Sequence, residues 1–284
     1  MEKSPDIKSI SALYSIKMLR KLIQILKKIN YLEQAMLINN HKYVFIAGLH
    51  RSGTTLLADC LKQHPDISSF ANTGFPKDEG QFLQSVYPPA REYGGPGKFG
   101  FCQEMHLTEG SNLINNGNRD KLYKEWSRYW DTTKPILMEK SPPNILKTRF
   151  LQEIFNDSYF LVITRHPLAV SLATQKWSFS TLEELLLHWA ICHKIFLEDL
   201  PYLKKCLIIK YEDLTSNLDS TLVNVYGYIG TFYHPYEGIV NKNINESYFH
   251  NWKNDDRISK IRSIVIKHER IFSCYGYYFN EVIT

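Results

Sequence analysis

The sequence predicts an α/β fold, with a doubly wound parallel sheet flanked by helices. Two observations lead to this prediction: short apolar runs alternate with segments of helical periodicity, and an irregular Gly- and Pro-rich insertion interrupts the alternation only once. The chain has 284 residues, of which 44% are hydrophobic and 22% charged, so it is long enough for one large domain with a sizeable core.

The expected strands are short apolar runs, and helical patterns follow them. Near-continuous apolar runs are typical of parallel sheets, because helices cover both faces of such a sheet. Ligands bind at the carboxyl ends of these strands, so polar residues that follow strands are the first candidates for a site. Strands are predicted at residues 43–47, 136–138, 159–164 and 206–210, and helices at 54–63, 144–155, 168–177, 182–200 and 218–229.

Two segments fall outside this alternation. Residues 1–42 carry 8 basic and 3 acidic residues, which leaves 26 of each in the rest of the chain, so this arm holds the whole formal charge of +5. Its apolar residues recur at helical spacing among lysines, which predicts a basic amphipathic helix that either packs on the domain or contacts a membrane surface peripherally. Residues 72–113 are too rich in Gly and Pro for regular elements and predict a binding loop or lid.

Cysteine and histidine usage bear on compartment and cofactors. The five cysteines are odd in number and form no CxxC pair, which favours reduced thiols in a cytoplasmic protein. We find no run of 18 apolar residues and no leader pattern. The ten histidines show no metal-ligand spacing, so we expect a protein that works without metal.

The first predicted strand enters the turn Gly48-Leu-His-Arg-Ser-Gly-Thr-Thr55. The spacing from Gly48 to Gly53 is that of a phosphate-binding P-loop, in which backbone N–H groups at a helix N-terminus surround an anion. A nucleoside triphosphatase has Lys after the second glycine, whereas this chain has Thr54 there and Arg51 inside the loop. The loop therefore suits a less charged terminal group than a triphosphate, and a glycine turn without ligand is the alternative.

The residues Arg51, Ser52, Gly53, Thr54 and Thr55 resemble the loop that binds the 5′-phosphosulfate in sulfotransferases dependent on PAPS (3′-phosphoadenylyl sulfate). In that family the loop has Arg or Lys, Ser, Gly, Thr, and Thr or Ser before a helix. The resemblance implies a P-loop-type sheet, with PAPS bound by these five residues. It also implies contact with the next residue of the helix, Leu56.

A second signature of the same family follows the predicted strand at residues 159–164. There Arg165 resembles the Arg that holds the 3′-phosphate of PAPS, and a planar guanidinium suits bidentate binding of a phosphate. The family has a Ser eight residues further on, but this chain has Ala173. The resemblance therefore leaves open whether Ser171 or Thr174 supplies the hydroxyl.

Two further segments resemble the family, and Tyr275-Gly276-Tyr277 near the C-terminus, which is similar to many members, extends the match to about residue 277. "IIKYEDL" is similar to the family's strand that ends in Tyr-Glu-Asp-Leu, which implies a cofactor contact by Tyr211. "NWKND" is similar to the Trp-Lys loop over the nucleotide in cytosolic members, which implies another contact by Lys253. Residues 43–284 are then expected to form a single sulfotransferase domain, with residues 72–113 on the acceptor side.

Sulfuryl transfer to an alcohol needs a group that removes the acceptor proton and positive charge near the leaving phosphate. "LMEKSPPN" resembles a segment of heparan sulfate N-sulfotransferases and implies that Lys140 is the electrostatic stabiliser. In Golgi-type members the base is a Glu downstream of the P-loop helix, which implies Glu79 here. Asp78, His106 and Glu139 stay open as alternative bases.

The predicted function is transfer of the sulfuryl group of PAPS to a hydroxyl of a carbohydrate or glycolipid, by in-line attack and without metal. The carbohydrate acceptor is implied by the greater resemblance to Golgi-type enzymes than to cytosolic small-molecule ones. A tyrosylprotein sulfotransferase is the alternative within the family. A P-loop kinase or a nucleotide-binding regulatory module is the alternative from another class, and Thr54 in place of Lys argues against it. No nucleic-acid partner is expected, and the oligomeric state is open.

Overall fold

The computed structural model describes residues 7–252 and 257–279, and the chain divides into two compact units. The first unit, Met1–Asn40, contains one 33-residue helix, α1 (Ile7–Asn39). The second unit, His41–Thr284, contains the sheet and all other helices of the described residues.

The second unit is built on five parallel strands in the order β2-β3-β1-β4-β5. This arrangement confirms the predicted doubly wound sheet. The sequence did not reveal β2, because it has only three residues and two of them are serines. The strands are β1 (Lys42–Gly48), β2 (Ile67–Ser69), β3 (Ile136–Lys140), β4 (Ser158–Thr164) and β5 (Cys206–Lys210).

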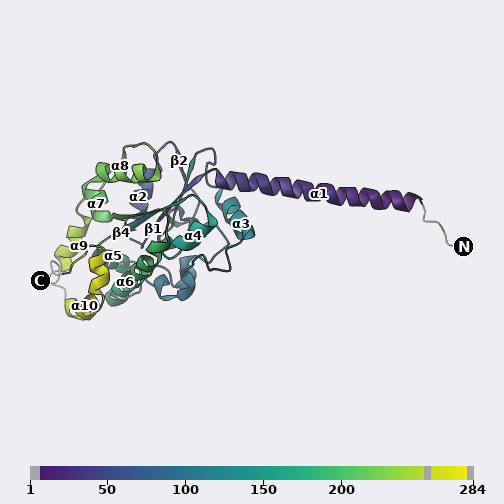
Figure 1. Cartoon of the computed structure of the whole chain (residues 1–284). Helices are drawn as coiled ribbons and strands as arrows, with labels where there is room; N and C mark the ends of the chain where they lie inside the picture. Colours follow the sequence, from purple (N-terminus) through teal and green to yellow (C-terminus); the bar gives the residue numbers. More distant parts are fainter. Residues whose placement is uncertain (1–6, 253–256, 280–284) are drawn as a thin grey trace. The chain divides into compact units, whose positions relative to one another are not determined.

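Helices cover both faces of the sheet. Figure 1 shows α2, α7 and α8 together on one side of the strands, and α5, α6 and α10 together on the other. The bounds are α2 (Thr54–Leu61), α3 (Asn116–Trp126), α4 (Thr148–Ile154), α5 (Pro167–Gln175), α6 (Leu182–Asp199), α7 (Tyr211–Ser216), α8 (Leu218–Ile229), α9 (Ile244–Trp252) and α10 (Ile258–Cys274).

Alternate residues of the central strand β1 serve two separate parts of the core. Val44 and Ile46 join the aliphatic cluster under α2 and α8. Phe45 points to the opposite face, where its ring centroid lies 6.2 Å from that of Trp126 and 5.7 Å from that of Phe155. Burial on both faces fixes β1 at the centre of the sheet, and with it the loop that follows its carboxyl end.

The structure differs from the predicted elements where local pattern competes with other constraints. The helix expected at residues 144–155 is interrupted, because the consecutive prolines start a 3₁₀ segment, Pro142–Leu146, before α4. The polar helix α3 has weak periodicity, and it is fixed by its buried Trp126 and by Asn115, whose side chain accepts a hydrogen bond from Asn118 N. Between residues 72 and 113 the chain forms only short 3₁₀ turns.

Candidate active site

The loop between β1 and α2 requires glycine at position 53. Gly53 has φ +105°, and a Cβ atom there would lie 2.5 Å from Cδ2 of Tyr211. The loop is closed by Ser52, whose Oγ donates to Leu49 O at 2.7 Å and accepts from Leu49 N at 3.2 Å. The Ser52 hydroxyl therefore holds the loop in shape.

The start of α2 presents unpaired donors. The first intrahelical bond runs from Leu57 N to Gly53 O at 3.1 Å, so the N–H groups of Thr54, Thr55 and Leu56 have no acceptor within the helix. These groups and the helix dipole favour an anion at this end. The Leu56 side chain packs against the apolar core, so any ligand contact of Leu56 is made by its backbone.

Arg165, at the carboxyl end of β4, is tied to the P-loop. Its Nη1 donates to the carbonyl oxygen of Arg51 at 2.9 Å, and its Nε donates to Oδ1 of Asn245 at 2.7 Å. Its guanidinium lies 4.3 Å from the ring centroid of Tyr211. Its Nη2 is buried and has no partner among the described residues, so it remains available to an anionic ligand.

A second layer of hydrogen bonds fixes Asn245, which the sequence did not point out. Asn245 donates from Nδ2 to Oε1 of Glu212 at 2.6 Å. The same carboxylate accepts from His166 N at 3.0 Å and, through Oε2, from the Tyr277 hydroxyl at 3.0 Å. Glu212 belongs to the Tyr-Glu-Asp-Leu segment, and this motif is the feature of the sequence that could have indicated the network.

The two residues expected to replace the family Ser share one face of α5. Ser171 and Thr174 face a small cavity beside His50, and the Ser171 Oγ is buried without a partner among the described residues. Lys176 instead places Nζ 4.7 Å from the ring centroid of Tyr248, which itself lies 5.7 Å from the Arg165 guanidinium. The structure thus brings Lys176, rather than Ser171 or Thr174, to the aromatic neighbour of Arg165.

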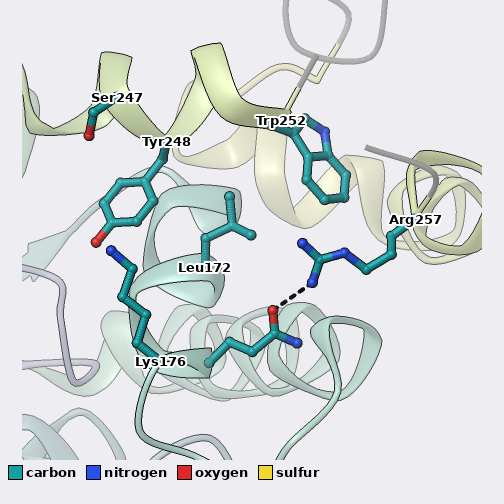
Figure 2. Close-up of a pocket in the computed structure, with 7 residues that line it drawn as sticks. Leu172, Lys176, Ser247, Tyr248, Trp252 and Arg257 are labelled. Atoms are coloured by element: carbon teal, nitrogen blue, oxygen red, sulfur yellow. Dashed lines mark hydrogen bonds between the residues drawn. The ribbon is translucent and has the colours of Figure 1, made fainter. Parts of the chain in front are cut away.

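A cavity of about 400 Å³ opens between α5, α9 and the start of α10, and Figure 2 shows Lys176 and Tyr248 pointing toward one another at its edge. Nη1 of Arg257 donates to Oε1 of Gln175 at 2.7 Å across the cavity. Lys253, predicted to contact the cofactor, lies outside the described residues. The lining residues are Leu172, Gln175, Lys176, Ser247, Tyr248, Trp252 and Arg257.

A second cavity, of about 410 Å³, lies between the P-loop and the insertion. Its lining combines P-loop residues, Glu79 and other polar side chains with the apolar side chains of Phe82, Ala90, Trp177 and three prolines. Arg51 has φ +69° and places its guanidinium 5.1 Å from the ring centroid of Trp177, at this cavity. The lining residues are His50, Arg51, Thr54, Thr55, Pro76, Lys77, Glu79, Gln81, Phe82, Ala90, Arg91, Pro96, Pro142 and Trp177.

Glu79 is 7% exposed and stands beside a buried cation. Lys140 Nζ lies 3.4 Å from Oε1 of Glu79 and donates to Lys77 O at 2.9 Å, while Gln81 Nε2 donates to Oε2 of Glu79 at 2.5 Å. Burial raises the pKa of the Glu79 carboxyl above its ordinary value, although the charge of Lys140 acts against this. A cavity-lining carboxylate with a raised pKa suits proton abstraction near neutral pH. Lys140 lies behind Glu79 and outside the cavity lining.

Glu139 anchors the insertion to the sheet. It is fully buried, and its carboxylate accepts hydrogen bonds from Gly80 N at 3.0 Å, from Ser141 Oγ at 2.5 Å and from Asn144 Nδ2. Burial raises the pKa of this carboxyl to about 7. Glu139 does not line the cavity. Its hydrogen bond from Gly80 N holds the backbone next to Glu79, so Glu139 positions Glu79.

The two remaining candidate bases are held elsewhere. Asp78 accepts from the backbone N and the Oγ1 of Thr73, both at 2.8 Å, so it stabilises the turn. Nε2 of His106 lies 2.8 Å from Oδ2 of Asp199, and Oδ1 of the same carboxylate accepts a hydrogen bond from Arg149 Nη1 at 3.1 Å. Neither Asp78 nor His106 lines the cavity beside the P-loop.

His50 is a site residue that sequence reasoning did not single out. It lines the cavity beside Arg51, and its Nδ1 is buried without a partner among the described residues. Burial lowers the pKa of the imidazole to about 3, and the charges of Lys140 and Arg51 act in the same direction. The ring is therefore neutral at physiological pH. It can give or accept a hydrogen bond inside the cavity.

The described part of the chain contains neither a cluster of metal ligands nor a helix that could span a membrane. No group of three or more His, Cys, Asp or Glu residues there could hold a metal ion. No helix in the same part is both long enough and apolar enough to cross a membrane.

The backbone of the P-loop gives a direct test of its geometry. Gly53→Ala should lower the free energy of unfolding by about 1–3 kcal/mol, because the substitution adds a Cβ at positive φ against Tyr211. Gly227→Ala is the matched control: this glycine lies in α8 with open space around it, so alanine should raise stability by about 0.5–1 kcal/mol. Urea denaturation measures both, and equal shifts of the two variants would contradict the loop conformation.

Comparison with known proteins identifies the family. A sequence model of the sulfotransferase family matches residues 44–235. The structure of the sulfotransferase domain from the curacin biosynthetic pathway is similar, with a TM-score of 0.54 and 18% identity over 84% of this chain and 98% of that one. The structure of the sulfotransferase domain from the Synechococcus PCC 7002 olefin synthase is also similar, with a TM-score of 0.53 and 16% identity over 84% of this chain and 96% of that one.

A search of curated proteins finds no significant match. At these identities the two solved structures show a common fold, while the family match extends over more than half of the sequence. The predicted family is confirmed: the chain belongs to the sulfotransferase family and is a sulfotransferase enzyme.

Proposed function

We propose that this enzyme transfers the sulfuryl group of PAPS to a hydroxyl of a glycolipid, with Glu79 as the general base. The observation that carries the proposal is the shared cavity, whose lining includes the P-loop residues, Glu79 and a set of apolar side chains. The family match does not distinguish Golgi-type from cytosolic members, so the greater resemblance to Golgi-type enzymes stays a prediction.

The donor side fits PAPS, which sulfotransferases generally use. PAPS supplies a sulfuryl group on a phosphate leaving group. The N–H groups at the start of α2 and the Arg51 guanidinium would hold the phosphosulfate. Arg165 would bind the 3′-phosphate through its unpaired Nη2, with Lys176 as the second cation in place of the hydroxyl missing at Ala173.

On the acceptor side, Glu79 takes the proton from the acceptor hydroxyl. The oxygen of that hydroxyl forms the new bond to sulfur as the bond from sulfur to the phosphate oxygen breaks. The ammonium of Lys140, 3.4 Å from the carboxylate, favours the ionised form of Glu79 and so acts against the effect of burial on its pKa. Lys140 thereby acts through Glu79, and its charge also favours the negative charge that develops in the transition state. Neutral His50 would orient the hydroxyl by a hydrogen bond.

The apolar part of the cavity lining favours an acceptor whose hydroxyl is attached to an apolar body. Phe82 and Trp177 provide aromatic surface, and prolines and an alanine add to this wall, while Lys77, Gln81 and Arg91 also line the cavity. Such a wall suits the boundary between a sugar and a lipid better than a free oligosaccharide, which needs many polar partners. A tyrosyl side chain also combines an apolar body with a hydroxyl, so a tyrosyl peptide is the second candidate acceptor.

The donor assignment predicts selective binding of PAP, the product form of PAPS. PAP should raise the melting temperature well above the shift produced by AMP, ATP or GTP, because ligand binding to the folded state adds to stability. Arg165→Ala should remove most of the difference between PAP and AMP. Differential scanning fluorimetry at equal nucleotide concentrations measures this, and equal shifts by AMP and PAP in the wild type would contradict the 3′-phosphate site.

The base assignment predicts a loss confined to the chemical step. Glu79→Gln should lower turnover roughly a hundredfold to ten-thousandfold and leave PAP affinity nearly unchanged, because the amide cannot accept the proton. Asp78→Asn and His106→Ala are the controls, since neither side chain lines the cavity. Turnover is measured with radiolabelled PAPS and a panel of glycolipid and tyrosyl-peptide acceptors. Near-normal turnover of Glu79→Gln together with loss in His106→Ala would refute the assignment.

A further inference from the structure

The helix α1 has a wide apolar face. Leu19, Leu22, Ile23, Leu26 and Ile29 recur every three or four residues, so they share one side of the helix. Other large apolar side chains widen this side into a broad band. The exposed large apolar residues of α1 are Met18, Leu19, Leu22, Ile23, Ile25, Leu26, Ile29, Leu32, Met36 and Leu37, with exposed fractions between 43% and 75%.

The opposite side of α1 is basic. Arg20 and Lys27 are seven residues apart, as are Lys21 and Lys28, which is about two helical turns. These four exposed residues therefore lie on one side of the helix. Residues 7–32 contain six basic residues and no Asp or Glu. The positive charge of this stretch is therefore not neutralised within the helix.

This combination disfavours a second copy of the helix as the partner of the apolar face. A coiled coil needs a narrow apolar seam with complementary charges beside it, whereas this face is broad and its flanks in residues 18–29 carry only positive charge. The rest of the chain, residues 43–284, has 26 basic and 26 acidic residues and adds no net charge attraction of its own.

We propose that α1 binds an anionic lipid bilayer, lying in the plane of its surface. The apolar side chains would enter the boundary between headgroups and acyl chains, and the basic side would face the anionic headgroups and the water. Negative lipid charge complements the six basic residues of this stretch. The helix is an interfacial anchor, and this role is independent of the acceptor that the enzyme sulfates.

Vesicle sedimentation of the full-length protein tests the proposal. Phosphatidylcholine vesicles that contain phosphatidylglycerol should bind the protein at least about tenfold more strongly than phosphatidylcholine alone, and salt should weaken the binding. The double variant Lys27→Glu/Lys28→Glu should lose about tenfold or more of this affinity, because each basic residue near an anionic surface contributes. The variant Lys27→Arg/Lys28→Arg keeps the charge and should bind like the wild type.

The apolar face is tested separately. Leu22→Gln/Leu26→Gln should abolish most of the vesicle binding with the same circular dichroism spectrum, since Gln keeps helix propensity. Gln24→Ala changes the polar side and is the matched control. Equal binding to neutral and anionic vesicles would overturn the proposal. The proposal would also be overturned if the protein failed to bind vesicles and formed a dimer in light scattering, and if the Leu22→Gln/Leu26→Gln variant did not form this dimer.

Discussion

The guanidinium of Arg165 is the interaction on which the donor side of the site depends. One nitrogen donates to the carbonyl of Arg51 in the P-loop, another donates to Asn245 on α9, and the plane lies against the ring of Tyr211. The ring of Tyr211 in turn lies so close to Gly53 that a Cβ atom at position 53 would come within 2.5 Å of it. A single cation therefore fixes the P-loop, β4, α7 and α9 relative to one another. It does so while one buried nitrogen stays available to a ligand.

The acceptor side depends on buried carboxylates in an analogous way. Glu139 accepts three hydrogen bonds from the insertion and from the segment after β3, so it holds the otherwise irregular insertion against the sheet. This anchor places Glu79 in the cavity beside the P-loop, next to Lys140. The two carboxylates have different roles, because Glu79 lines the cavity and Glu139 does not.

The sequence predicted those parts of the fold that local pattern determines. Near-continuous apolar runs gave four strands of the sheet, and the glycine spacing together with Arg51 located the P-loop. The strand β2 is too short and polar for periodicity to reveal it. In α10, by contrast, the helical spacing of Ile261, Val265 and Phe272 was a signal from which that helix could have been predicted. Asn245, Lys176 and His50 could not be predicted, because their contacts join segments far apart in the chain. Helical spacing showed that Ser171 and Thr174 share a face of α5, but only tertiary packing decides where that face points.

Hydrogen exchange with and without PAP tests the central claim most directly, since that claim is one nucleotide site shared by three distant segments. The account predicts that PAP slows exchange together at residues 49–56, 165–176 and 244–252, and that AMP protects the first segment more than the other two. Protection by PAP that is confined to the P-loop, with no change at residues 165–176 and 244–252, would contradict it.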